Sequence, residues 1–212
     1  MGEQRNTPNP VAARKPRAWQ RMLSGRRLDL LNPAPTDVEI EDIAHGLARV
    51  ARWNGQTLGD HAFSVAQHSL LVDEIAGARE PEWEARWRLA TLLHDSPEYV
   101  IGDLISPFKN AIGLDYKQFE LRLLAAIHER FGLPAQLPGE VQAEIKTCDR
   151  IAAFFEATRL AGFATEEALA FFGEPPGLPQ EVRERLETLS PLPAEQAQKR
   201  FAARFDWLIE RL

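Results

Sequence analysis

Apolar residues recur at a spacing of three to four positions along most of this 212-residue chain. That spacing is typical of amphipathic helices, and it constrains the fold more than any other feature. Thr36 and Glu39 indicate a capping box at the start of the first helix, and we see no alternating strand pattern bounded by hairpin turns. The pattern predicts an all-α fold, with long helices over residues 37–53, 61–77, 81–95, 116–132, 139–162 and 194–212.

One domain accounts for a chain of this length. The sequence is 44% hydrophobic, which is enough for one sizeable core, and we find no internal repeat, low-complexity tract or convincing linker. We predict a partly disordered N-terminal extension over residues 1–35, followed by a single domain over residues 36–212. Within that domain, residues 163–193 are rich in Pro and Gly and predict short helices.

Composition bears on the compartment and the partners. No apolar run approaches the roughly 18–20 residues of a membrane span, and the N-terminus lacks the apolar segment of a secretory signal. The single cysteine, Cys148, forms no internal disulfide, which favours a reducing cytoplasm. A net charge of −6 with mixed signs indicates no nucleic-acid footprint. We expect a cytoplasmic protein without membrane or nucleic-acid partners, and leave a homodimer open.

Side chains of metal-ligand type fall on the buried stripes of three separate predicted helices: His68, His94 and Asp149. Asp95 follows His94 directly, after two leucines. An ionised carboxylate among apolar residues is costly unless something pairs with it, and a shared cation is the simplest partner. Imidazole and carboxylate ligands suit Mn, Co, Fe or Zn.

Each of these residues also has an ordinary interpretation when taken alone. A single histidine on an apolar helix face is usually a satisfied core residue, and a lone aspartate is more often a cap. An HD dipeptide occurs often by chance. The combination, in the order H…HD…D on successive inward faces, is a much stronger signal.

The segments "VAQHSLLV", "LLHDSPEYVIGD" and "KTCDRIAAFFEA" resemble the HD-domain phosphohydrolases, and within them the bacterial YfbR-like 5′-deoxynucleotidases. The resemblance covers residues 37–162 and implies a helical HD-domain bundle. It also implies one divalent transition metal ion (Co, Mn, Fe or Zn), held by His68, His94, Asp95 and Asp149. Only His128 lies between the HD pair and the final aspartate, which argues against a second metal; we expect it to cap helix carbonyls.

Further positions match the deoxynucleotidases. Arg52 and Trp53 precede the first ligand histidine at the family's spacing, and Glu98 follows the HD pair by three residues. The resemblance implies that Arg52 and Glu98 are catalytic and that Trp53, Asp103 and Lys109 bind substrate. From chemistry alone, Arg52 and Lys109 suit phosphate, and Trp53 offers a flat face to a sugar or base. The ordinary alternatives are a core tryptophan, a helix-capping Asp103 and a solvated Lys109.

The resemblance implies a metal-dependent phosphohydrolase, a phosphomonoesterase that removes the 5′-phosphate from (deoxy)nucleoside monophosphates. Two alternatives stay open: hydrolysis of a nucleoside triphosphate or another phosphoester at the same site, and a non-catalytic HD-fold binding protein. HD enzymes that cleave cyclic dinucleotides typically carry a GYP motif after HD, and this chain has no such motif. Pro97, which departs from the nucleotidase pattern, predicts a helix end or kink directly after the motif.

Overall fold

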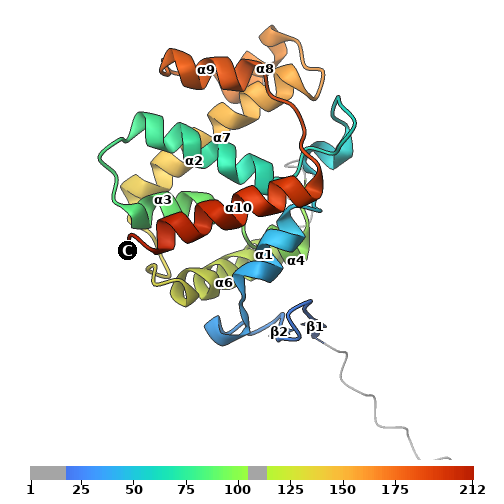
Figure 1. The fold of residues 1–212 in the computed structure, drawn as a ribbon, viewed down its shortest axis with the longest axis vertical. Helices are drawn as coiled ribbons and strands as arrows, with labels where there is room; N and C mark the ends of the chain where they lie inside the picture. Colours follow the sequence, from blue (N-terminus) through green and yellow to red (C-terminus); the bar gives the residue numbers. More distant parts are fainter. Residues whose placement is uncertain (1–17, 105–113) are drawn as a thin grey trace, which may run out of the picture.

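The computed structural model describes residues 18–104 and 114–212. The prediction of an all-α single domain is confirmed, because the described residues are mostly helical and add only a two-stranded hairpin (Figure 1). The described helices are α1 (Ile40–Leu47), α2 (Val65–Arg79), α3 (Ala85–Leu92), α4 (Glu98–Ile101), α6 (Leu114–Arg130), α7 (Gly139–Arg159), α8 (Thr165–Phe172), α9 (Gln180–Glu187) and α10 (Ala194–Ile209).

Helix α2 lies at the centre of the fold. It packs against α3, α7 and α10, which surround it in Figure 1, and most of its side chains are buried. Ser64 caps its start by accepting a hydrogen bond from the backbone N–H of Gln67. Because α2 has almost no exposed face, its polar residues His68 and Asp73 must find partners inside the protein.

Two groups of buried apolar side chains form the core, and α2 contributes to both. One group joins α1, α3, α6 and α10 and includes Val65 from the start of α2. The other joins the later part of α2 to α7 and α9, and includes Ile75. Since one helix serves both groups, the core is shared across the domain.

The longer predicted helices are confirmed to within a few residues at α2, α6, α7 and α10. The longest of the described helices is α7, with 21 residues, and it carries acidic and basic side chains along its length. Among the described residues, no helix combines the length and the apolar character that a membrane crossing requires.

A short hairpin was not predicted. Strands β1 (Trp19–Arg21) and β2 (Arg27–Asp29) pair antiparallel, and Leu28 is completely buried in the core. The carboxylate of Asp42 on α1 accepts hydrogen bonds from the Ser24 backbone and hydroxyl at 2.9 and 2.5 Å. Three-residue strands are too short to show alternation, so the expectation of no strands is wrong here.

The start of the domain also differs from the prediction. Helix α1 covers only part of residues 37–53, between the 3-10 turns η1 (Pro35–Asp37) and η2 (Arg52–Gly55). The predicted capping box is wrong: the helix starts after Glu39, whose side chain makes no cap and instead pairs with Arg26 and Arg130. Tertiary ion pairs have replaced the local hydrogen bond.

Helices α1 and α4 meet at a glycine. A Cβ atom on Gly46 would lie 2.8 Å from the Cβ of Tyr99 and 3.0 Å from its carbonyl oxygen. Only glycine allows this approach. The contact positions the start of α4, which carries Glu98.

Candidate metal centre

His68 projects from α2 with its side chain fully buried. Its Nδ1 lies 2.6 Å from Oε1 of Glu156, and a carboxylate partner favours the tautomer in which Nδ1 donates. The lone pair of Nε2 is then directed away from Glu156, where Nε2 makes no hydrogen bond of good geometry in the described part of the chain. A metal-binding histidine typically shows this arrangement.

His94 and Asp95 lie in the turn between α3 and α4. The prediction extended the helix to residue 95 with a break at Pro97, but α3 already ends at Leu92, and Pro97 is instead the N-cap residue of α4. The Nδ1 of His94 lies 2.8 Å from the carbonyl oxygen of Thr91. Donation to that carbonyl leaves the Nε2 lone pair of His94 available, as at His68.

Asp149 on α7 completes the group. Nε2 of His68 lies 3.2 Å from Oδ1 of Asp149 and 3.3 Å from Oδ2 of Asp95, and Nε2 of His94 lies 3.2 Å from the same Asp95 oxygen. Ligands bound at about 2.1 Å to one ion are separated by about 3.0–3.4 Å. The donor atoms of His68, His94 and Asp149 all lie within 4.8 Å of one another. This group could hold a metal ion, with Asp95 beside it.

Glu156 is the centre of the charge network behind these residues. It is completely buried, and its Oε2 accepts hydrogen bonds from Arg52 Nε and Trp53 Nε1, each at 2.9 Å. Burial raises the pKa of Glu156, but Arg52 and His68 outweigh it and bring the pKa to about 2. Glu156 therefore stays ionised and orients His68.

Carboxylates dominate the electrostatics of the centre. Burial and Arg52 lower the pKa of His68, but Glu156, Asp149 and Asp95 more than compensate, so its pKa is raised well above its ordinary value. Burial raises the pKa of Asp95, but His94 and His68 hold it well below its usual range. The centre attracts positive charge, which a divalent cation can supply.

An isolated β-bridge between Ala51 and Ser64 brings Arg52 close to the centre. The backbone N–H of Arg52 donates to the carbonyl of Phe63 at 2.8 Å, next to the pairing of Ala51 with Ser64. This pairing brings residue 52 close to the start of α2. The Nη1 atom of Arg52 lies 3.6 Å from Oδ2 of Asp95, so the guanidinium lies beside the predicted ligands.

Trp53 has a strained backbone and a crowded ring. Trp53 and Asn54 have φ values of 56° and 51°, a left-handed conformation that costs about 1–3 kcal/mol each outside glycine. The indole packs edge-on against Phe163 and Phe172, at centroid distances of 5.6 and 6.2 Å. These contacts and the hydrogen bond to Glu156 make Trp53 a support of the centre; its predicted sugar contact stays a prediction.

The other predicted site residues have different positions. Glu98 is buried in the first turn of α4. Asp103 follows that helix and is one of the carboxylates that raise the pKa of Arg52 against the opposing effect of burial. Lys109 lies outside the described residues.

A cavity of about 530 Å³ adjoins the centre between α3, α6 and α7. His94 and Asp149 of the centre are among its lining residues, and most of the wall is apolar. The polar residues elsewhere on its wall are His128, Gln136, Gln142 and Lys146.

His128 and Cys148 lie outside the ligand group, and both are buried. His128 is buried, and its pKa is lowered by burial against the opposing effect of the Pro134 and Ala135 carbonyls. His128 lies near the end of α6, as expected, but its buried ring nitrogens make no hydrogen bond of good geometry with the described residues, so the predicted capping of helix carbonyls is wrong. Cys148 is a buried core residue, as predicted, and burial raises the pKa of its thiol to about 12.

Sequence reasoning missed Glu156. A signal was present, because Glu156 follows Asp149 by seven residues in "DRIAAFFE", two helical turns along the same face. A carboxylate there is flanked by apolar residues, so it has to find a buried partner. The sequence does not indicate that this partner is His68.

Comparison with known proteins places the chain in a family. No family model matches it. It is 56% identical over 196 residues to the uncharacterized protein RCAP_rcc00048 of Rhodobacter capsulatus, covering 92% of this chain and 98% of that protein. It is also 36% identical over 98 residues to the uncharacterized protein YfdR of Escherichia coli, covering 46% and 49%. The chain belongs to the same family as RCAP_rcc00048.

Proposed function

We propose that this chain is a metal-dependent phosphohydrolase that removes the 5′-phosphate from nucleoside monophosphates, with a preference for deoxy forms. The observation that carries the proposal is the convergence of His68, His94, Asp95 and Asp149 beside the guanidinium of Arg52. The resemblance to the HD-domain phosphohydrolases, and to the YfbR-like deoxynucleotidases in particular, supports it.

In this proposal the two histidines and two aspartates hold the cation. A divalent cation at such a position acts as a Lewis acid toward a phosphoryl oxygen and lowers the pKa of water. Arg52 stays protonated because neighbouring carboxylates raise its pKa, and it neutralises phosphate oxygens. Glu156 fixes both His68 and Arg52, so one carboxylate aligns the cation and anion sites.

Glu98 is the proposed acid or base. It is a buried carboxylate three residues beyond Asp95, and its backbone N–H donates to the Asp95 carbonyl at 3.0 Å. In this role it takes a proton from the attacking water or gives one to the leaving oxygen. Its position in the first turn of α4 depends on the close contact of Gly46 with Tyr99.

The proposed substrate contacts are Trp53, Asp103 and Lys109, as the resemblance implies. Because the Trp53 N–H already donates to Glu156, any sugar contact must use the ring itself. The apolar wall of the 530 Å³ cavity suits a base or sugar beside the phosphate. We include that cavity in the proposed substrate site.

The test combines elemental analysis with a phosphate-release assay on dAMP, AMP and the matching triphosphates, with Co²⁺, Mn²⁺ and Zn²⁺ added in turn. We expect phosphate from the monophosphates, dAMP first, and about one divalent metal ion per chain. His94→Ala should lose metal and activity together, whereas His61→Ala, the same change at an exposed histidine, should keep both.

Other outcomes identify the alternatives. If the protein releases phosphate from the nucleoside triphosphates but not from the monophosphates, its reaction is the hydrolysis of triphosphates. Retained metal with no turnover of any nucleotide would assign a binding protein.

A further inference from the structure

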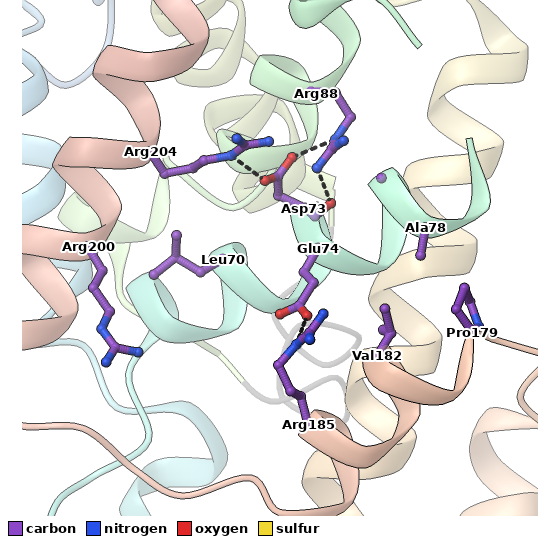
Figure 2. Close-up of a pocket in the computed structure, with 11 residues that line it drawn as sticks. Leu70, Asp73, Glu74, Ala78, Arg88, Pro179, Val182, Arg185, Arg200 and Arg204 are labelled. Carbon is purple, nitrogen blue, oxygen red and sulfur yellow. Dashed lines mark hydrogen bonds and ion pairs between the residues drawn. The ribbon is translucent and has the colours of Figure 1, made fainter. Parts of the chain in front are cut away.

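A second pocket, lined by several charged residues, lies on a different face of α2 from His68. It has a volume of about 670 Å³ and lies where α2 meets α9 and α10, with one residue from α3. None of the residues of the candidate metal centre lines it. Its charged residues are Asp73, Glu74, Arg88, Arg185, Arg200 and Arg204 (Figure 2).

Asp73 is shared by two arginines. Its Oδ1 accepts from Arg88 Nε at 2.8 Å and its Oδ2 from Arg204 Nε at 2.7 Å, and Figure 2 shows both guanidinium groups converging on it. The two arginine side chains are only 18% and 24% exposed. One carboxylate balances one of these cations, so positive charge remains in a partly desolvated place, where it favours an anion.

Arg200 adds to this surplus. Glu74 pairs with Arg185, but the side chain of Arg200, an exposed residue one turn before Arg204 on α10, makes no hydrogen bond, ion pair or ring contact with the residues that the structure describes. In Figure 2 no dashed line reaches its guanidinium group. The arginines of the pocket therefore outnumber its carboxylates, in a protein with a net charge of −6.

The arginines also have a structural role, which explains only part of the cluster. The pairs at Asp73 and Glu74 join α2 to α3, α10 and α9, and they account for three of the four arginines. They do not account for Arg200, and they leave Asp73 with one negative charge between two guanidinium groups. A Cβ atom on Gly77 would lie 2.2 Å from Nη1 of Arg88, so glycine lets Arg88 lie flat on α2.

We propose that this pocket is a second ligand site, separate from the metal centre, that binds an anion carrying phosphate groups. Guanidinium groups match phosphate with paired N–H donors. Arg200 supplies donors that have no partner in the described chain, and Arg204 and Arg185 each use Nε in their ion pair. Leu70 and Val182 give the pocket an apolar wall, against which a less polar part of the ligand packs.

The experiment is a calorimetric titration of the full chain with pyrophosphate in chelator, so that divalent metal at the other site does not contribute. We expect one saturable site per chain. Arg200→Gln should weaken binding about tenfold or more, as expected for the loss of a charged hydrogen-bond donor. Lys199→Gln, the same charge change at the neighbouring residue outside the pocket, should stay within about twofold.

The proposal is overturned if pyrophosphate shows no saturable binding or if the two variants weaken it equally. The Arg200 side chain has no partner among the described residues, so its replacement should leave the melting temperature unchanged. His94→Ala must retain pyrophosphate binding, and loss of binding in that variant would place the anion at the metal centre instead. Repeating the titration with a nucleoside diphosphate identifies the source: tighter binding than pyrophosphate indicates a nucleotide, and equal binding indicates the phosphate groups alone.

Discussion

At Glu156, one buried carboxylate takes hydrogen bonds from three side chains. Its Oε1 is the partner of His68, and its Oε2 is the partner of Arg52 and Trp53. Burying an isolated carboxylate is costly, but here Arg52 and His68 lower its pKa to about 2 against the effect of burial. This residue couples the predicted metal ligand to the predicted phosphate-binding arginine.

Glu156→Gln tests that coupling. An amide can still accept from His68, but it has only one acceptor oxygen and no charge to balance Arg52. We expect metal affinity to fall about 10–100-fold, the usual effect of losing such a partner, in a competition titration against a chelating dye. Glu140→Gln, at an exposed position in the first turn of the same helix, is the control. Unchanged affinity in the Glu156 variant would contradict the coupling.

Glu98 bears on the proposed reaction. Glu98→Gln keeps the shape of the side chain but cannot exchange a proton. We expect near-normal metal content and nucleotide binding with kcat reduced about 10²–10⁴-fold, measured by phosphate release with dAMP. A kcat within about threefold of native would show that no proton passes through Glu98. Loss of the metal would instead make Glu98 a ligand or a support of one.

Among the elements, α8 packs its last residue against Trp53. Phe172 at its end and Phe163 before it pack on Trp53, which in turn holds Glu156. Phe171 is 69% exposed, and among the described residues its ring pairs with Phe163 and Phe172 but not with Trp53. The Pro-rich segment 163–193 therefore supports the candidate site.

Phe172→Ala should loosen Trp53. The loss of one edge-on aromatic contact is worth about 0.5–1.5 kcal/mol, and the freed indole should weaken its bond to Glu156. We expect metal affinity to drop several-fold and tryptophan fluorescence to change. Phe171→Ala removes the same side chain from the next position and should have little effect on either. Equal responses from both variants would show that α8 does not position Trp53.

In the whole molecule, the predicted ligands come from three separate places along the chain. His68 lies on α2, His94 and Asp95 in the turn after α3, and Asp149 on α7. A cation bound there would join these elements across the core. It would also offset the repulsion between the aspartates: burial and Asp95 raise the pKa of Asp149, although His68 outweighs them and lowers it below its ordinary value.

Removing the metal should therefore destabilise the fold. A ligand whose free concentration is about 100 times its dissociation constant adds roughly 2.7 kcal/mol to the free energy of unfolding. Each kcal/mol shifts the melting temperature of a chain this size by about 2–4 °C. We expect chelation to lower the melting temperature by about 5–10 °C and added Mn²⁺ or Co²⁺ to restore it, by differential scanning calorimetry. His94→Ala should melt at one temperature with or without chelator. A native protein indifferent to both treatments would argue against a tightly held ion.

The sequence alone determined the helical class, the positions of the longer helices and the residue types that could bind a metal. Periodicity achieves this because it reports, residue by residue, which side of an element is buried, and His68 and Asp149 lie on such sides. It also indicated that the helix could not continue through Pro97, but the structure ends α3 earlier, at Leu92, and begins α4 directly after Pro97.

Only the tertiary structure decided which buried groups meet. Glu39 pairs with Arg26 and Arg130 instead of forming the predicted capping box. Leu28 of the hairpin packs against residues of other elements, and Glu156 on α7 is the hydrogen-bond partner of His68 on α2. The local sequence pattern indicates that a buried polar group needs a hydrogen-bond partner. The packing of α2 against α3, α7 and α10 decides which residue that partner is. The arginines around Asp73 come from separate helices for the same reason, so no stretch of sequence could show them as one pocket.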